Sequence, residues 1–163
     1  MYSLLKLRNK EEIISGGDGK SVTFWSTKTF KKEYTVECCD CYSLNGLIEL
    51  PNHYVAVNGG VSSTIDIIDT EHYQRIKQNK YKGYIVDNGG YFSSLHLLSN
   101  GTFIYSHLGC LCQISSITYE ILKPIKMKNE FEGTTITSSL NGKYILAGNM
   151  DRGISTFKIN YID

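Results

Sequence analysis

Cysteine and histidine are the residue types of this chain best suited to bind a metal ion. Three cysteines fall in the run CCDC at residues 38–41, two more form CLC at residues 110–112, and His107 lies nearby. Zinc takes four Cys or His ligands in tetrahedral geometry, so two such groups would make a zinc staple between two parts of the chain. The C-x-C spacing differs from the usual zinc knuckle, and about seventy residues separate the groups. We therefore expect packed thiols and no metal site.

Other patterns that carry chemistry are weaker still. No G-x-S-x-G elbow surrounds a serine, and the four histidines stand apart along the chain. The glycine-rich runs GGDGK and NGGVSS precede strands and lack phosphate-loop spacing, which favours tight turns. Asp66 and Asp69 are an odd number of residues apart, so one strand cannot present both on one face. We expect no catalytic residue and no cofactor; a hydrolase using carboxylates of distant strands stays the enzymatic alternative.

Composition limits the partners. The net charge is +1, with 41% hydrophobic and 20% charged residues, which is typical of a folded domain and argues against strong binding to nucleic acid or anionic membranes. No apolar run approaches the roughly 20 residues that span a bilayer, and the first residues lack the apolar core of a signal peptide. We expect a cytoplasmic or nuclear protein with reduced thiols.

A repeat of about forty residues organises the chain. In each unit a short apolar stretch ends in Leu, and a polar turn, a second strand, another turn and a third strand follow. The four leucines are Leu7, Leu50, Leu98 and Leu140. A period near forty with several short strands is typical of a β-propeller blade. The sequence predicts one repeat domain over 1–163, with blades at about 1–39, 40–85, 86–128 and 129–163.

Alternation of apolar and polar residues predicts fifteen strands and almost no helix, with 71–80 as the best helical exception. The expected strands are 3–7, 12–15, 21–26, 33–37, 47–50, 54–57, 64–69, 72–77, 94–98, 102–106, 111–115, 119–125, 135–140, 144–148 and 154–159. The fold class is therefore all-β, a partial or small β-propeller of about four four-stranded antiparallel blades, the last of which lacks its outer strand.

Two segments carry a family resemblance. Residues 14–18 (ISGGD) and 22–26 (VTFWS) resemble the second and third strands of a WD-repeat blade, and residues 147–158 keep the same length. The chain departs from the family pattern because Trp occurs once, the Gly-His pair is absent, and the terminal Asp survives only as Asp69. The Asp-His-Ser-Trp hydrogen-bond network of the family is therefore not expected to be intact.

This resemblance implies a non-enzymatic scaffold that binds peptides or proteins on the face carrying the turns between second and third strands. The residues expected on that face are Asp18, Lys20, Ser62, His107, Met150, Asp151 and Arg152. A regulatory or substrate-recognition segment of a larger protein, such as a ubiquitin ligase, is an alternative of the same kind. Stacked repeats leave apolar faces on terminal units, so self-association or further blades are also expected.

Overall fold

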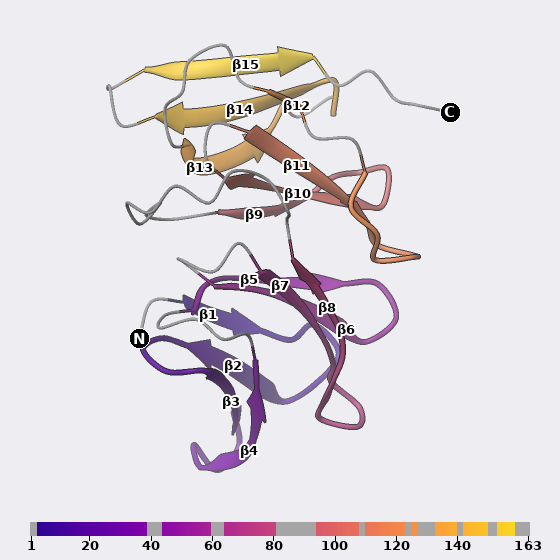
Figure 1. Ribbon diagram of the computed structural model, residues 1–163. Coiled ribbons are helices and arrows are strands. Elements are labelled where there is room, and N and C mark those ends of the chain that lie inside the picture. Colours follow the sequence, from indigo (N-terminus) through magenta and orange to yellow (C-terminus); the bar gives the residue numbers. More distant parts are fainter. Residues whose placement is uncertain are drawn as a thin grey trace. The chain divides into compact units, whose positions relative to one another are not determined.

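The computed structural model describes residues 3–38, 44–59, 64–80, 94–107, 110–122, 125–126, 133–139, 142–149 and 153–158. These residues form fifteen strands and no helix (Figure 1). The expected all-β fold class is thereby confirmed, and the helical alternative for 71–80 is wrong because that segment forms a turn followed by a strand. The chain divides into two compact units, Met1–Lys82 and Gly83–Asp163.

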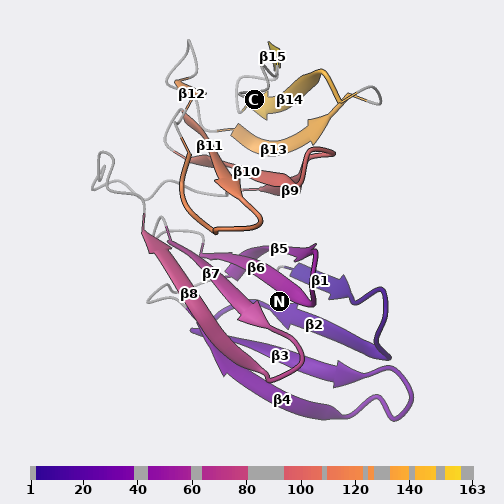
Figure 2. The ribbon, with the colours of Figure 1, turned by 90° about the vertical axis from the view of Figure 1, so that its right-hand side faces the viewer.

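The first unit contains two sheets, each with four antiparallel strands in sequence order (Figure 2). The strands of the first sheet are β1 (Ser3–Lys6), β2 (Glu12–Gly16), β3 (Ser21–Ser26) and β4 (Lys32–Glu37). Those of the second sheet are β5 (Leu44–Leu50), β6 (Tyr54–Gly59), β7 (Thr64–Asp69) and β8 (Gln74–Lys80). Consecutive pairing is what short connections between neighbouring strands favour.

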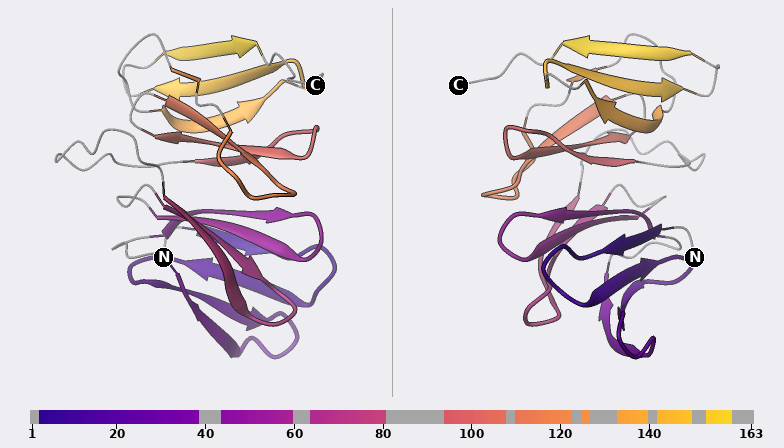
Figure 3. Two further views of the ribbon diagram at one scale, coloured as in Figure 1. Left: turned by 45° about the vertical axis from the view of Figure 1, so that its right-hand side comes forward. Right: turned by 180° about the vertical axis from the view of Figure 1, so that it is seen from behind.

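The second unit continues the pattern (Figure 3). Its first sheet is made of β9 (Leu95–Leu97), β10 (Thr102–His107), β11 (Cys110–Ser115) and β12 (Ile125–Lys126). Its second sheet is made of β13 (Gly133–Ser138), β14 (Tyr144–Asn149) and β15 (Ile154–Lys158). Three strands form this last sheet in the described part of the chain, as the sequence predicted.

The first hairpin of each sheet closes in the same way. Equivalent residues of the four sheets can therefore be matched by counting from this closure, and we call this matching the common register. The amide of Leu7 donates to the carbonyl of Glu12, Leu98 does the same to Thr102, and Leu50 pairs with Tyr54. In the last sheet the residue at this place is Ser139, whose amide donates to Tyr144. The leucine expected at this place, Leu140, lies outside the described residues.

Each sheet has two faces, which we name by their neighbours. Within each unit, the face of the first sheet that packs on the second is called the forward face, and the face of the second sheet that packs on the first is called the rear face; the same names apply to the equivalent faces of the other sheets. In the first unit Ile14 and Phe24 on the forward face of the β1–β4 sheet share a buried core with Val55 and Ile68 on the rear face of the β5–β8 sheet. In the second unit Leu98, Ile104 and Leu111 on the forward face of the β9–β12 sheet pack on a rear face formed by Ile136, Ile145 and Phe157.

A five-residue turn follows the third strand in three sheets. It starts at Ser26, Asp69 or Ser115, whose side-chain oxygen accepts hydrogen bonds from the two backbone amides found two and three residues later. An aromatic residue with positive φ ends the turn each time, namely Phe30 (54°), Tyr73 (51°) and Tyr119 (58°). Side-chain capping of this kind competes with strand pairing. This explains why β8, the fourth strand of its sheet, starts at Gln74 and not at residue 72 as predicted.

Candidate interaction surfaces

The residues predicted from the sequence to form a binding face are only partly described. Asp18 and Lys20 lie together, exposed, on the turn between β2 and β3. The carbonyl of Lys20 accepts a hydrogen bond from the amide of Cys38 at 2.6 Å, which anchors the turn. His107 ends β10 in the other unit. Ser62, Met150, Asp151 and Arg152 lie outside the described residues, so the proposed face stays a prediction.

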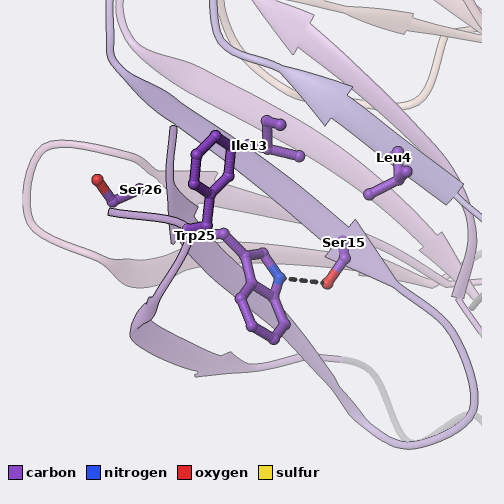
Figure 4. A pocket seen from close by; sticks show the side chains of 6 residues that line it. Leu4, Ile13, Ser15, Trp25 and Ser26 are labelled. Carbon is purple, nitrogen blue, oxygen red and sulfur yellow. Dashed lines mark hydrogen bonds between the residues drawn. The ribbon is translucent and has the colours of Figure 1, made fainter. Parts of the chain in front are cut away.

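A shallow, open hollow lies instead on the rear face of the β1–β4 sheet (Figure 4). Its volume is about 290 Å³. The lining residues are Leu4, Ile13, Ser15, Trp25, Ser26 and Phe30. Leu4 pairs with Ser15 across β1 and β2, and Ile13 pairs with Trp25 across β2 and β3, so these side chains share one side of the sheet.

The indole of Trp25 is held in place by its neighbour on the next strand. Its Nε1 donates a hydrogen bond to Ser15 Oγ at 2.8 Å (Figure 4). Ser15 and Trp25 are diagonal neighbours on the same side of the sheet, because Trp25 pairs with Ile13 and Ser15 pairs with Thr23. The fixed ring presents a rigid apolar surface with 38% of its area exposed.

Phe30 makes the hollow more apolar from the side. It ends the turn after β3, and 80% of its surface is exposed. Leu4 is also unusually exposed for its type, at 60%. Large apolar side chains gathered at one place on a folded protein usually mark a contact surface.

The matching turn after β7 shows what an aromatic residue at this place can do. Tyr73 reaches back to the forward face of the β1–β4 sheet, where its ring stacks on Tyr34 with centroids 3.7 Å apart and meets Phe24 edge to face at 5.1 Å. The Tyr73 hydroxyl donates to Glu12 Oε1 at 2.5 Å, and Lys10 Nζ lies 4.8 Å from the ring centroid. Burial, together with the Glu12 carboxylate, raises the pKa of Tyr73. Tyr73 is thus a neutral clamp between two sheets.

A charged pair occupies the same turn. His72 Nδ1 lies 2.7 Å from Asp69 Oδ2. Burial by itself raises the pKa of Asp69, but hydrogen bonds from the His72 ring and from two turn amides outweigh it, so that the net effect lowers this pKa. The hydrogen bond and the charge of Asp69 raise the pKa of His72. The pair is therefore ionised on both sides between the lowered pKa of Asp69 and the raised pKa of His72.

This pair predicts a pH-dependent contribution to stability. The stabilisation from His72 is complete below the ordinary pKa of histidine and disappears as the pH rises through the raised pKa of His72. The stabilisation from Asp69 disappears as the pH falls through the lowered pKa of Asp69. Replacing His72 with Ala should lower the urea midpoint more at about pH 5.5 than at about pH 8.5. His72→Gln keeps a hydrogen-bonding side chain without the titrating charge, so its midpoint deficit should vary less with pH. An equal deficit for His72→Ala at both pH values would contradict the assignment.

The cysteines and carboxylates singled out from the sequence lie in separate places in the described part of the chain. Cys38 and Cys112 are buried cysteines. Asp66 is fully buried, and its Oδ2 lies 3.8 Å from Arg75 Nη1, while Asp69 caps a turn. No group of three or more His, Cys, Asp or Glu residues has metal-binding geometry among these residues. Asp66 and Asp69 thus have different surroundings, one beside an arginine and the other in a turn.

Sequence reasoning missed the aromatic residues that end the turns. The signal was present as a Ser or Asp, then Ser or Thr, then two residues and an aromatic residue, at 26–30, 69–73 and 115–119. The second residue of each turn donates its backbone amide to the carbonyl before the second strand, at Glu11, His53 and Gly101. The turn does not stand out in the strand pattern, because only one of the three, at 69–73, starts with Asp.

Comparisons with known proteins address the fold. No family model matches the chain, and no curated protein matches its sequence. Among solved structures, the chain is similar to the WD40 β-propeller domain of Doa1, with a TM-score of 0.74 and 13% identity over 96% of this chain and 51% of that chain. It is also similar to hydrazine synthase from Kuenenia stuttgartiensis, with a TM-score of 0.74 and 19% identity over 91% of this chain and 43% of that chain.

The fold therefore has the blade architecture of a β-propeller, with antiparallel sheets of three or four strands following one another along the chain. The chain spans about half the length of each of these solved chains. At these identities the likeness extends to the fold alone. Within the described ranges, no helix is long and apolar enough to cross a membrane.

Proposed function

We propose that the chain is a non-enzymatic scaffold for protein–protein interaction, and that its contact surface is the rear face of the β1–β4 sheet together with Phe30. The observation that supports this most is the open hollow lined by Leu4, Ile13, Trp25 and Phe30. Tryptophan is prominent among the residues that dominate binding energy at interfaces, because a rigid ring loses little conformational entropy when it is covered. Propeller folds supply rigid sheets on which such a surface can be held.

The composition of the hollow favours binding over catalysis. Its six lining residues include no carboxylate, imidazole, amine or thiol. General acid–base and nucleophilic catalysis need a titratable group or an activated nucleophile next to the reacting atoms. Lys6, Lys28 and Lys31 are exposed and lie within two residues of a lining residue along the chain. An apolar centre with a charged rim is the usual anatomy of a protein contact.

The experiment compares baits that differ at one surface each. The 163-residue chain is immobilised as wild type, as Leu4→Asp in the rear face, and as the double variant Asp151→Ala with Arg152→Ala in the predicted turn-bearing face. Leu122→Asp is the matched control, because it makes the same change at another exposed leucine. Proteins that bind the wild type and Leu122→Asp but do not bind Leu4→Asp are purified and titrated against the chain. Trp25 is its only tryptophan, so its emission reports directly on this surface.

The expected result is a purified partner that shifts Trp25 emission to shorter wavelength and binds Leu4→Asp at least about tenfold more weakly, because a carboxylate would be buried without a partner. Loss of partners with the Asp151 and Arg152 variant alone would move the contact to the turn-bearing face. Equal binding by all baits would overturn the proposed surface.

A further inference from the structure

The sheet contact described within each unit follows the same pattern, and the β1–β4 sheet has an exposed face with one half of that pattern. In the second sheet the rear face presents two cross-strand pairs, Leu47 with Val57 and Val55 with Ile68. In the last sheet the same positions hold Ile136 with Ala147 and Ile145 with Phe157. Both sets include residues of the inter-sheet cores.

The rear face of the β1–β4 sheet keeps this pattern. In the common register its pairs are Leu4 with Ser15 and Ile13 with Trp25. Three of these four positions are apolar, as in a rear face that packs on another sheet. Leu4 and Trp25 nevertheless remain 60% and 38% exposed. This face therefore has the residue pattern of a rear face that packs on another sheet, but its side chains are exposed.

Phe30 supports the same conclusion independently. It occupies the position of Tyr73, at the end of the capped turn and with the same positive φ. Tyr73 packs across the sheet contact onto Phe24 and Tyr34 of the preceding sheet. Phe30 has the same backbone geometry but is 80% exposed. It is placed to contact the forward face of a sheet that would lie before β1–β4.

The β13–β15 sheet carries a forward face of the required kind. Its central residue Leu146 pairs with Thr156, and Gly148 pairs with Ile154. In the common register Leu146 matches Ile104, and Ile154 matches Leu111, both of which pack on a rear face in the second unit. Ile154 is 74% exposed and Tyr144 is 39% exposed. An open forward face and an open rear face thus occur in one chain.

The polar positions are compatible as well. Where the β9–β12 sheet meets the β13–β15 sheet, His96 Nε2 lies 3.0 Å from Ser138 Oγ. The matching positions are Thr137 on the open forward face and Lys6 on the open rear face. A lysine amine can donate a hydrogen bond to a threonine hydroxyl, so the contact places no like charges opposite each other at this point.

We infer that a second copy of this chain covers the hollow, with the forward face of its β13–β15 sheet packed on the rear face of the β1–β4 sheet and on Phe30. This inference rests on the proposed function, because it names the partner of the same surface. The contact is heterologous, since two different patches meet. After one such contact, one copy retains an open forward face and the other retains an open rear face for the next contact.

Sedimentation velocity and light scattering of the full chain, between about 1 and 100 µM, test the inference. The wild type should show a mass above the 18.4 kDa of one chain, with a shift of Trp25 emission as concentration rises. Leu4→Asp and Ile154→Lys should each weaken association at least about tenfold, because either places a charge in an apolar contact. Ile117→Lys, at an 85% exposed position outside both faces, should associate as the wild type does.

Mixing gives the sharpest result. Leu4→Asp retains an intact forward face and Ile154→Lys retains an intact rear face, so an equimolar mixture should associate more strongly than either variant alone. Wild type that stays monomeric, or association unaffected by both variants, would overturn the inference. If the wild type is monomeric while Leu4→Asp still loses a different purified partner, the second copy is excluded and the scaffold function stands. Circular dichroism confirms that each variant is folded.

Discussion

Truncating Phe24 to Ala is expected to lower the free energy of unfolding by about 3–5 kcal/mol. Phe24 is fully buried in the core between the β1–β4 and β5–β8 sheets, and its ring meets Tyr73 edge to face. The variant loses the transfer free energy of an aromatic ring and leaves a cavity that two paired sheets cannot easily close. Urea denaturation followed by circular dichroism measures the change, since the sheet signal reports on the whole unit.

The conservative variant Phe24→Leu separates packing from a general effect of mutation at this position. It keeps an apolar side chain in the core and should lose clearly less stability than Phe24→Ala. Ile117→Ala, at an 85% exposed position, should leave the midpoint nearly unchanged. Equal midpoints for Phe24→Ala and the wild type would mean that the two sheets do not share the core described above.

Removing Tyr73 should have the second largest effect, about 3 kcal/mol for Tyr73→Ala. The residue is only partly buried, yet it contributes the stack on Tyr34, the edge contact with Phe24 and a hydrogen bond to Glu12. Tyr73→Ala would also leave the Glu12 carboxylate, which is 8% exposed, without its hydroxyl donor. An unsatisfied buried acceptor adds to the cost of the lost ring.

Tyr73→Phe distinguishes the ring from the hydroxyl. It keeps the aromatic contacts and removes only the donor to Glu12, so it should cost about 1–3 kcal/mol. The same denaturation curves measure both variants. A loss for Tyr73→Phe as large as that for Tyr73→Ala would show that the rings contribute little, and would weaken the parallel drawn between Tyr73 and Phe30.

The strands were predictable because their determinants are local. In β3 the alternation of Val22, Phe24 and Ser26 with exposed or half-buried residues gives the period of two directly. Glycine and asparagine marked the turns. The repeat of about forty residues then predicted the blade architecture, since a unit that cannot bury its faces alone must stack on another like it.

The candidate surface was much less predictable. Ile13 and Ile14 are the same residue type and adjacent, yet Ile14 is fully buried in the sheet contact whereas Ile13 lines the open hollow. Nothing in the local sequence says which face of β2 meets another sheet. Likewise, Phe30 and Tyr73 end the same kind of turn but differ in whether a neighbouring sheet covers them.

The amino-acid order alone determined the strands, the turns and their fourfold repetition, because hydrogen bonding along a ladder and side-chain alternation depend on near neighbours in the chain. Only the tertiary structure decided which apolar face became core and which stayed open at the β1–β4 sheet. Burial depends on what lies across from a side chain, and residues distant in sequence supply that, as Tyr73 does for Phe24.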